Sequence, residues 1–234
     1  MQPLSVSGTV VRGPALTRLR RLFFGHLLPA ILFSGFWVAK LLLSLDALRA
    51  PHNDAMSVIY LVNLVLGLIF YTITIVLFSV RLPRLDGDRR AGIVFASFFG
   101  TLAILAIGVL PGRGGHPALI LPGALLLAAG ILYSIWGLAT LRRSFSILPE
   151  ARRLVVRGPY ALSRNPLYLG EFVAAVGLML PSVGVWQVSL LAAVVAAQLV
   201  RIHAEEGVLE ARFGSEYRDY RAAVPRYLPR LWRG

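Results

Sequence analysis

The sequence predicts an all-α fold, a polytopic membrane helix bundle of about six transmembrane helices. Three observations predict it. Of the 234 residues, 57% are hydrophobic and only 15% are charged; the mean hydropathy is +0.71; and several apolar runs exceed the ~18 residues that a bilayer core requires. Roughly half of the residues of an ordinary globular domain are already apolar. A soluble domain of this length could therefore not bury the apolar surface of the additional hydrophobic residues.

Six apolar segments are the candidate membrane helices. They cover residues 22–45, 55–80, 91–110, 117–141, 167–181 and 183–200. The first is too long for the apolar part of a signal peptide and is followed by no A-x-A-like cleavage site, so we interpret it as a retained span. At ~1.5 Å per residue, the first four can cross a ~30 Å hydrocarbon core. Pro181 and Gly184 separate the last two and predict a tight helical hairpin with a short first arm.

The chain changes character after the last apolar segment. Ile202, Leu209 and Phe213 fall on one helical stripe, with charged residues elsewhere. Four aromatic residues of this segment suit a membrane–water interface, namely Tyr217, Tyr220, Tyr227 and Trp232. We therefore expect the last span to continue as a helix beyond the membrane and to be followed by a cytoplasmic interfacial helix.

The distribution of Arg predicts the orientation. The N-terminal tail and the 81–90 loop hold four Arg each, the 142–165 connection holds six and the segment from Arg201 onward holds seven, whereas the other two loops hold one each. The positive-inside rule then places both termini of a multi-pass membrane protein in the cytoplasm. The net charge of +13 matches anionic lipid headgroups, so we expect membrane lipids and not nucleic acid as partners.

Metal and thiol chemistry find little support in the sequence. The chain has no Cys, which excludes disulfides, thiolate nucleophiles and Cys-based metal sites. The four His residues lack the spacing of metal ligands, and we expect no metal site. They are His26, His52, His116 and His203.

Polar side chains capable of chemistry gather in two stretches, RGPYALSRNPLYLGE at 157–171 and RIHAEE at 201–206. The predicted hairpin lies between them, so we expect the two stretches to be neighbours in space. Arg201 and Glu205 are four apart and share a helix face, whereas Glu206 is turned by about 100°. The pair is either a salt bridge at a membrane boundary or a cation and an acid that hold a ligand.

The first stretch also allows two interpretations. Asn165 and Pro166 can be the N-cap and first residue of the hairpin helix. That reading leaves the accompanying Tyr and Arg residues unexplained. A helix N-terminus that carries aromatic groups and donors is a natural site for an anionic or nucleoside ligand.

Together the two stretches resemble a known family. The run SFSILPEARRLVVRGPYALSRNPLYLGE, followed after the hairpin by RIHAEEGVLEARFGSEYRDYRAAVPRYLP, is similar to the isoprenylcysteine carboxyl methyltransferases and the related membrane phospholipid methyltransferases. These families carry G-x-Y, R-H-P-x-Y-x-G, R-x-x-x-E-E and F-G-x-x-Y-x-x-Y-x-x-x-V-P. The resemblance covers about residues 144–229. We therefore divide the chain into N-terminal transmembrane helices, 1–141, and a cofactor-binding methyltransferase region, 142–234.

The resemblance implies an enzyme that binds S-adenosylmethionine in a cytoplasmic-side pocket rather than in a Rossmann domain. Glu205 would meet the ammonium end of the cofactor, and Arg201 would be the catalytic residue that holds the acceptor. The implied lining residues are Leu154, Val155, Tyr160, Asn165, Pro166, Leu167 and Tyr168. Asn165 stands where the families most often have His, so it can form hydrogen bonds but cannot titrate.

The activity implied is methyl transfer to a lipophilic acceptor at the cytoplasmic membrane face, most like isoprenylcysteine carboxyl O-methylation. Phospholipid N-methylation and small-thiol S-methylation would use the same cofactor site. Membrane sterol reductases look similar at their C-terminal ends but need a pocket for the 2′-phosphate of NADPH, whereas Glu205 offers an acid. A transporter should show spans broken by Gly and Pro in matching halves, or an ionisable residue in mid-bilayer, where only Lys40 is found. Residues 1–140 carry no readable code for the acceptor, and the oligomeric state is open.

Overall fold

The protein is described by a computed structural model that covers residues 27–45, 49, 55–80, 86–87, 90–107 and 117–228. The predicted all-α bundle is confirmed. Its helices are α2 (Leu28–Leu43), α4 (Ala55–Val80), α5 (Ala91–Ile107), α6 (Pro117–Leu141), α7 (Pro166–Met179), α8 (Val185–Phe213) and α9 (Ser215–Ala223). Two very short strands, β1 (Asp86–Gly87) and β2 (Glu150–Ala151), pair antiparallel.

The apolar segments coincide closely with helices. Three helices are long and apolar enough to cross a membrane, namely Ala55–Val80, the helix that starts at Pro117 and α8, and three shorter apolar helices accompany them. α2 begins at Leu28 and α5 ends at Ile107; the remaining parts of their predicted spans, 22–26 and 108–110, lie outside the described residues. The number of crossings and the side on which the termini lie stay predictions.

The predicted hairpin is present. α7 ends at Met179, a 3₁₀ turn covers Leu180–Ser182, and α8 starts after Gly184. As predicted, the helix of the last span runs on past residue 200 to Phe213, where α9 follows. Gly214, between α8 and α9, has φ +54°, a left-handed conformation that favours glycine.

Small residues hold α7 tightly against α6. A side chain on Gly130 of α6 would meet the backbone of Gly170 and Ala174 of α7, and Gly177 lies equally close to Gly123. Such small-residue surfaces let helix backbones approach closely in membrane proteins. With 14 residues, α7 is only about 21 Å long, and this contact fixes its position and therefore that of the residues at its N-terminus.

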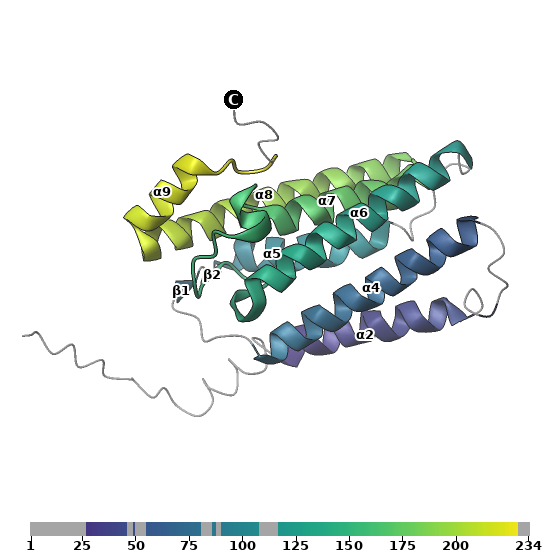
Figure 1. Ribbon diagram of the computed structural model, residues 1–234, viewed down its shortest axis with the longest axis horizontal. Helices are drawn as coiled ribbons and strands as arrows, with labels where there is room; N and C mark the ends of the chain where they lie inside the picture. The colour runs from purple at the N-terminus through teal and green to yellow at the C-terminus, as the bar shows by residue number, and fades with distance from the viewer. Residues whose placement is uncertain are drawn as a thin grey trace, which may run out of the picture.

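The site-forming segments lie at one end of the bundle. Figure 1 shows α9, β1 and β2 at the end where α6 finishes and α7 begins. The connection from α6 to β2 is anchored there by a ring cluster, in which Phe78 of α4 stacks on Phe33 and meets Phe145 edge-on, with ring centres 5.9 and 5.3 Å apart. The 142–165 connection is thus packed onto the helices rather than projecting from them.

Candidate functional site

A cavity opens at this end of the bundle. It encloses about 850 Å³ of atom-free space, including its open mouth, between the 144–165 connection, α7, α8 and α9. All the predicted site residues line it except Pro166: Leu154, Val155, Tyr160, Asn165, Leu167, Tyr168, Arg201 and Glu205. Pro166 is fully buried as the first residue of α7. The hairpin therefore brings the two polar stretches of the sequence to one cavity.

Tyr168, Arg201 and Glu205 form a compact cluster on one wall. The Tyr168 hydroxyl donates to Glu205 Oε1 at 2.7 Å, and Arg201 Nε donates to the same oxygen at 3.3 Å. The Arg201 guanidinium also lies over the Tyr168 ring, 4.9 Å from its centre. Within the described part of the chain, Glu205 Oε2 has no hydrogen-bond partner, so one carboxylate oxygen is left for a ligand.

Arg201 is fixed from several directions. Its side chain is 4% exposed. Besides Glu205, it donates to Thr101 Oγ1 of α5 and to the carbonyl oxygen of Ser146, both at 3.1 Å. A buried guanidinium with this many acceptors cannot swing away, so its charge has one position in the cavity wall.

Asn165 serves the architecture of the site. It occupies the N-cap position of α7, and Pro166 is the first helical residue, as predicted, but the Asn165 side chain makes no capping bond. Its amide nitrogen instead donates to Glu206 Oε1 at 3.3 Å and to the carbonyl oxygen of Arg226 at 3.0 Å. Both N–H groups of the amide are thereby used, and its oxygen remains as an acceptor.

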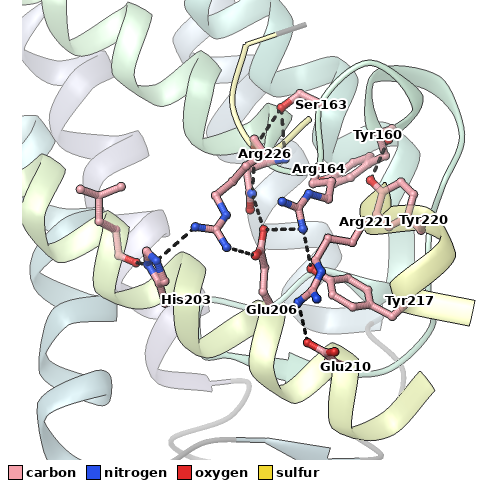
Figure 2. Close-up of polar contacts among 12 residues, drawn as sticks. Tyr160, Ser163, Arg164, His203, Glu206, Glu210, Tyr217, Tyr220, Arg221 and Arg226 are labelled. Carbon is pink, nitrogen blue, oxygen red and sulfur yellow. Dashed lines mark hydrogen bonds and ion pairs between the residues drawn. The ribbon is translucent and has the colours of Figure 1, made fainter. Parts of the chain in front are cut away.

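Glu206 is a residue whose part in the site the sequence did not reveal. Figure 2 shows its carboxylate between two guanidinium groups: Oε1 pairs with Arg164 at 3.3 Å and Oε2 pairs with Arg226 at 2.7 Å. Arg226 also contacts His203 Nε2 at 3.2 Å. Glu206 therefore ties α8 to the start of α7 and to the segment after α9. The adjacent acid pair was a signal, but nothing in the sequence located the arginine partners.

Aromatic groups close the side of the cavity formed by α9. The Tyr220 hydroxyl donates to the carbonyl oxygen of Tyr160 at 2.7 Å, and Arg164 contacts the hydroxyl of Tyr217 at 3.5 Å. Burial raises the pKa of Tyr160 well above its usual range and raises that of Tyr217 to about 12. These phenols are therefore neutral at physiological pH, and both residues line the cavity.

Unsatisfied donors also point to a ligand. The Nε atoms of Arg152 and Arg164 are buried and have no hydrogen-bond partner among the described residues, and both residues line the cavity. Arg152 is otherwise engaged with Glu150 Oε2 at 2.6 Å. Leaving a buried donor unpaired costs about 1–3 kcal/mol or more. A bound anionic group that accepted hydrogen bonds from these two Nε atoms would remove this cost.

The described residues offer no metal centre. No group of three or more His, Cys, Asp or Glu side chains in this part of the chain could hold an ion. The ring of His203 contacts Arg226 and the backbone of Leu199. His26, His52 and His116 lie outside the described residues.

Comparison with known proteins finds a family model that matches part of the chain. Residues 118–216 match the family model of the phospholipid methyltransferases. The nickel-cobalt-cadmium resistance protein NccN of Alcaligenes xylosoxydans xylosoxydans is 33% identical over 82 residues, which are 35% of this chain and 38% of that protein. The family match includes every site residue predicted from the sequence. The region 118–216 of this chain is thus similar to the phospholipid methyltransferases, which lie within the superfamily that the sequence motifs indicated.

Proposed function

We propose that this protein is an integral-membrane methyltransferase that uses S-adenosylmethionine and methylates a lipophilic acceptor at the cytoplasmic face. The single observation that carries the proposal is the cluster of Tyr168, Arg201 and Glu205, in which the Glu205 carboxylate lines the cavity and has one oxygen without a hydrogen-bond partner among the described residues. The family match of this region supports the same activity.

The lining of the cavity fits the cofactor group by group. The second oxygen of Glu205 suits the ammonium end, and the Nε donors of Arg152 and Arg164, which lack a partner among the described residues, suit the carboxylate. Leu154 and Val155 offer apolar surface for the flat base. When bound, the cofactor supplies an electrophilic methyl group on a sulfonium sulfur.

The contribution of the chain to the reaction is alignment and fixed charge. Arg201 is held in place by its three acceptors, and Glu205 by Tyr168 and Arg201. Charges fixed in this way need no reorganisation during the reaction, which is the main source of electrostatic catalysis. Arg201 would hold the polar end of the acceptor.

A second cavity is the candidate binding site for the lipophilic acceptor. It holds about 1740 Å³ of atom-free space, including its open mouth, and has a mainly apolar lining from α2, α4, α5, α6, α7 and α8. It meets the cofactor cavity at Phe145, Leu167 and Arg201. A lipid chain fits this space by chemistry, because ligand cavities for apolar groups are lined mainly by hydrophobic and aromatic side chains. The acceptor would enter from the bilayer and the cofactor from the cytosol.

The acceptor that the sequence favours is the carboxylate of an isoprenylcysteine, which needs no general base. A second class, the amine of a phospholipid, is favoured by one structural observation: Glu171 also lines the apolar cavity. The sulfur of a small thiol would need no such lipid cavity.

The test is methyl transfer from labelled S-adenosylmethionine by the purified protein in lipid nanodiscs. The acceptors are a prenylcysteine analogue, phosphatidylethanolamine and a small thiol. We expect label in one lipophilic product. Label in no product, in a preparation that is folded by its thermal transition, would contradict the proposed activity.

A further inference from the structure

The starting observation is the position of Glu171 at the meeting point of two apolar spaces. It lines the 1740 Å³ cavity and also a groove of about 810 Å³ between α7 and α8. Among the lining residues, the two spaces share Glu171 and Ile104. A lipid chain in either space can therefore present its polar end to this carboxylate.

Glu171 also adjoins the cofactor cavity. Tyr168, one turn earlier on α7, lines both the cofactor cavity and the groove, and Arg201 lines both the cofactor cavity and the larger apolar cavity. Tyr168 and Arg201 contact each other. Glu171 thus lies directly behind the wall at which the methyl donor and the acceptor would meet.

The carboxylate is held, but it is not neutralised by an ion pair. Gln198 Nε2 donates to Glu171 Oε2 at 2.8 Å. No cation lies within ion-pair distance of Glu171, and no hydrogen bond reaches its Oε1, among the residues that the structure describes. An acid retained in an apolar part of a membrane helix bundle, without an ion-pair partner among the described residues, is a functional site by default.

Gln198 can support both charge states of this acid. Its Nε2 donates to the carboxylate and, at 3.4 Å, to the carbonyl oxygen of Gly100, while its own Oε1 is buried and has no hydrogen-bond partner among the described residues. An amide can turn so that its oxygen faces a neighbour. Once Glu171 holds a proton, the carboxylic acid can donate to that oxygen.

On the basis of the proposed methyltransferase function, we infer that Glu171 accepts the proton that an ammonium acceptor must lose before methylation, with Gln198 as its positioning residue. The acceptor's ammonium transfers one proton to the Glu171 carboxylate and becomes a neutral amine. The nitrogen lone pair then forms a bond to the methyl carbon as the carbon–sulfur bond breaks, and that electron pair remains on sulfur. Glu171 finally releases its proton to water.

The charges around the junction agree with an amine acceptor. Arg201 is paired with Glu205, whereas Glu171 has no ion-pair partner among the described residues; Lys40 is the other cation that lines the larger cavity. A carboxylate acceptor would add a second negative charge beside Glu171. The other polar or titratable groups that line the larger cavity and the groove are Lys40, Ser44, Tyr60, Tyr71, Thr74, Thr101, Ser134, Tyr168, Gln198 and Tyr227.

The experiment compares the wild-type protein with Glu171→Gln and Glu171→Asp in nanodiscs that contain phosphatidylethanolamine. Methyl transfer is measured from pH 6 to 9, and cofactor binding is measured separately by calorimetry. Glu210→Gln is the matched control, because Glu210 lies on α8 outside the cavity lining, in an exposed pair with Arg221.

We expect Glu171→Gln to bind the cofactor as the wild type does but to methylate the amine about 10²–10⁴-fold more slowly at pH 7. Its rate should rise about tenfold per pH unit, because only the neutral fraction of an amine with a pKa of about 10.4 can react. The wild type should show a flatter profile, and Glu171→Asp should recover part of the rate with that flatter profile.

Two results would overturn the inference. One is a Glu171→Gln rate at pH 7 equal to that of the wild type, or lowered by the same factor at every pH. The other, which does not depend on any variant folding, is wild-type methylation of a prenylcysteine carboxylate but not of the amine lipid. If the wild type binds no cofactor, the proposed function itself has failed.

Discussion

Replacing Glu206 by Gln removes the charge that holds the site together. The pair with Arg164 is buried, with side chains 8% and 9% exposed, whereas Arg226 is 33% exposed. Removing one partner of a buried pair costs about 3–5 kcal/mol, and a pair with an exposed partner contributes at most about 1 kcal/mol. Since Gln keeps an oxygen that can accept a hydrogen bond, we expect a loss near the lower bound, about 3 kcal/mol.

The loss is measured by thermal unfolding in nanodiscs, followed by tryptophan fluorescence. For chains of about 150–250 residues, 1 kcal/mol corresponds to a Tm shift of about 2–4 °C, so Tm should fall by about 6–12 °C. Glu210→Gln is the control, because its pair with Arg221 has side chains 34% and 45% exposed and should contribute at most about 1 kcal/mol.

Limited proteolysis gives a second readout. Arg226 is tied to Glu206 and His203 in the wild type, so trypsin cleavage after Arg226 should be faster in Glu206→Gln. Equal melting temperatures and equal cleavage rates for the Glu206 and Glu210 variants would refute the view that Glu206 anchors the segment after α9.

Two further substitutions test other contacts. Tyr168→Phe removes a 2.7 Å hydrogen bond to Glu205. Because this bond contributes about 1 kcal/mol to holding the carboxylate in place, its loss should weaken cofactor binding about fivefold by calorimetry. An unchanged Kd would show that the hydroxyl is dispensable. Gly130→Leu forces a side chain into the backbone of Ala174 and should destabilise the protein by about 1–3 kcal/mol or more in thermal unfolding. Gly35→Leu, with open space around it, should not; equal effects of the two would argue against the close α6–α7 contact.

The helices were predictable from the sequence because long apolar runs have few alternatives. The spans 55–80 and 117–141 match α4 and α6, and Pro181 with Gly184 marked the hairpin. Once the hairpin is recognised, the meeting of Tyr168 with Glu205 follows, because both lie at its open end.

The long-range polar contacts were not predictable in the same way. Arg226 is separated from Glu206 by the whole of α9, and no local spacing rule connects them. The same holds for the apolar cavity, whose lining comes from helices spread over most of the chain. Glu171 stood in the quoted stretch 157–171, but only the shared lining of two spaces showed what its carboxylate faces.

The most direct test of the central claim is a calorimetric titration of the wild type and Glu205→Gln with S-adenosylmethionine, with Glu210→Gln alongside. The wild type and the Glu210 variant should bind in the micromolar range typical of cofactor sites, and Glu205→Gln should lose measurable binding. No binding by a folded wild-type protein, or equal binding by all three proteins, would contradict the assignment of this cavity as the methyl-donor site.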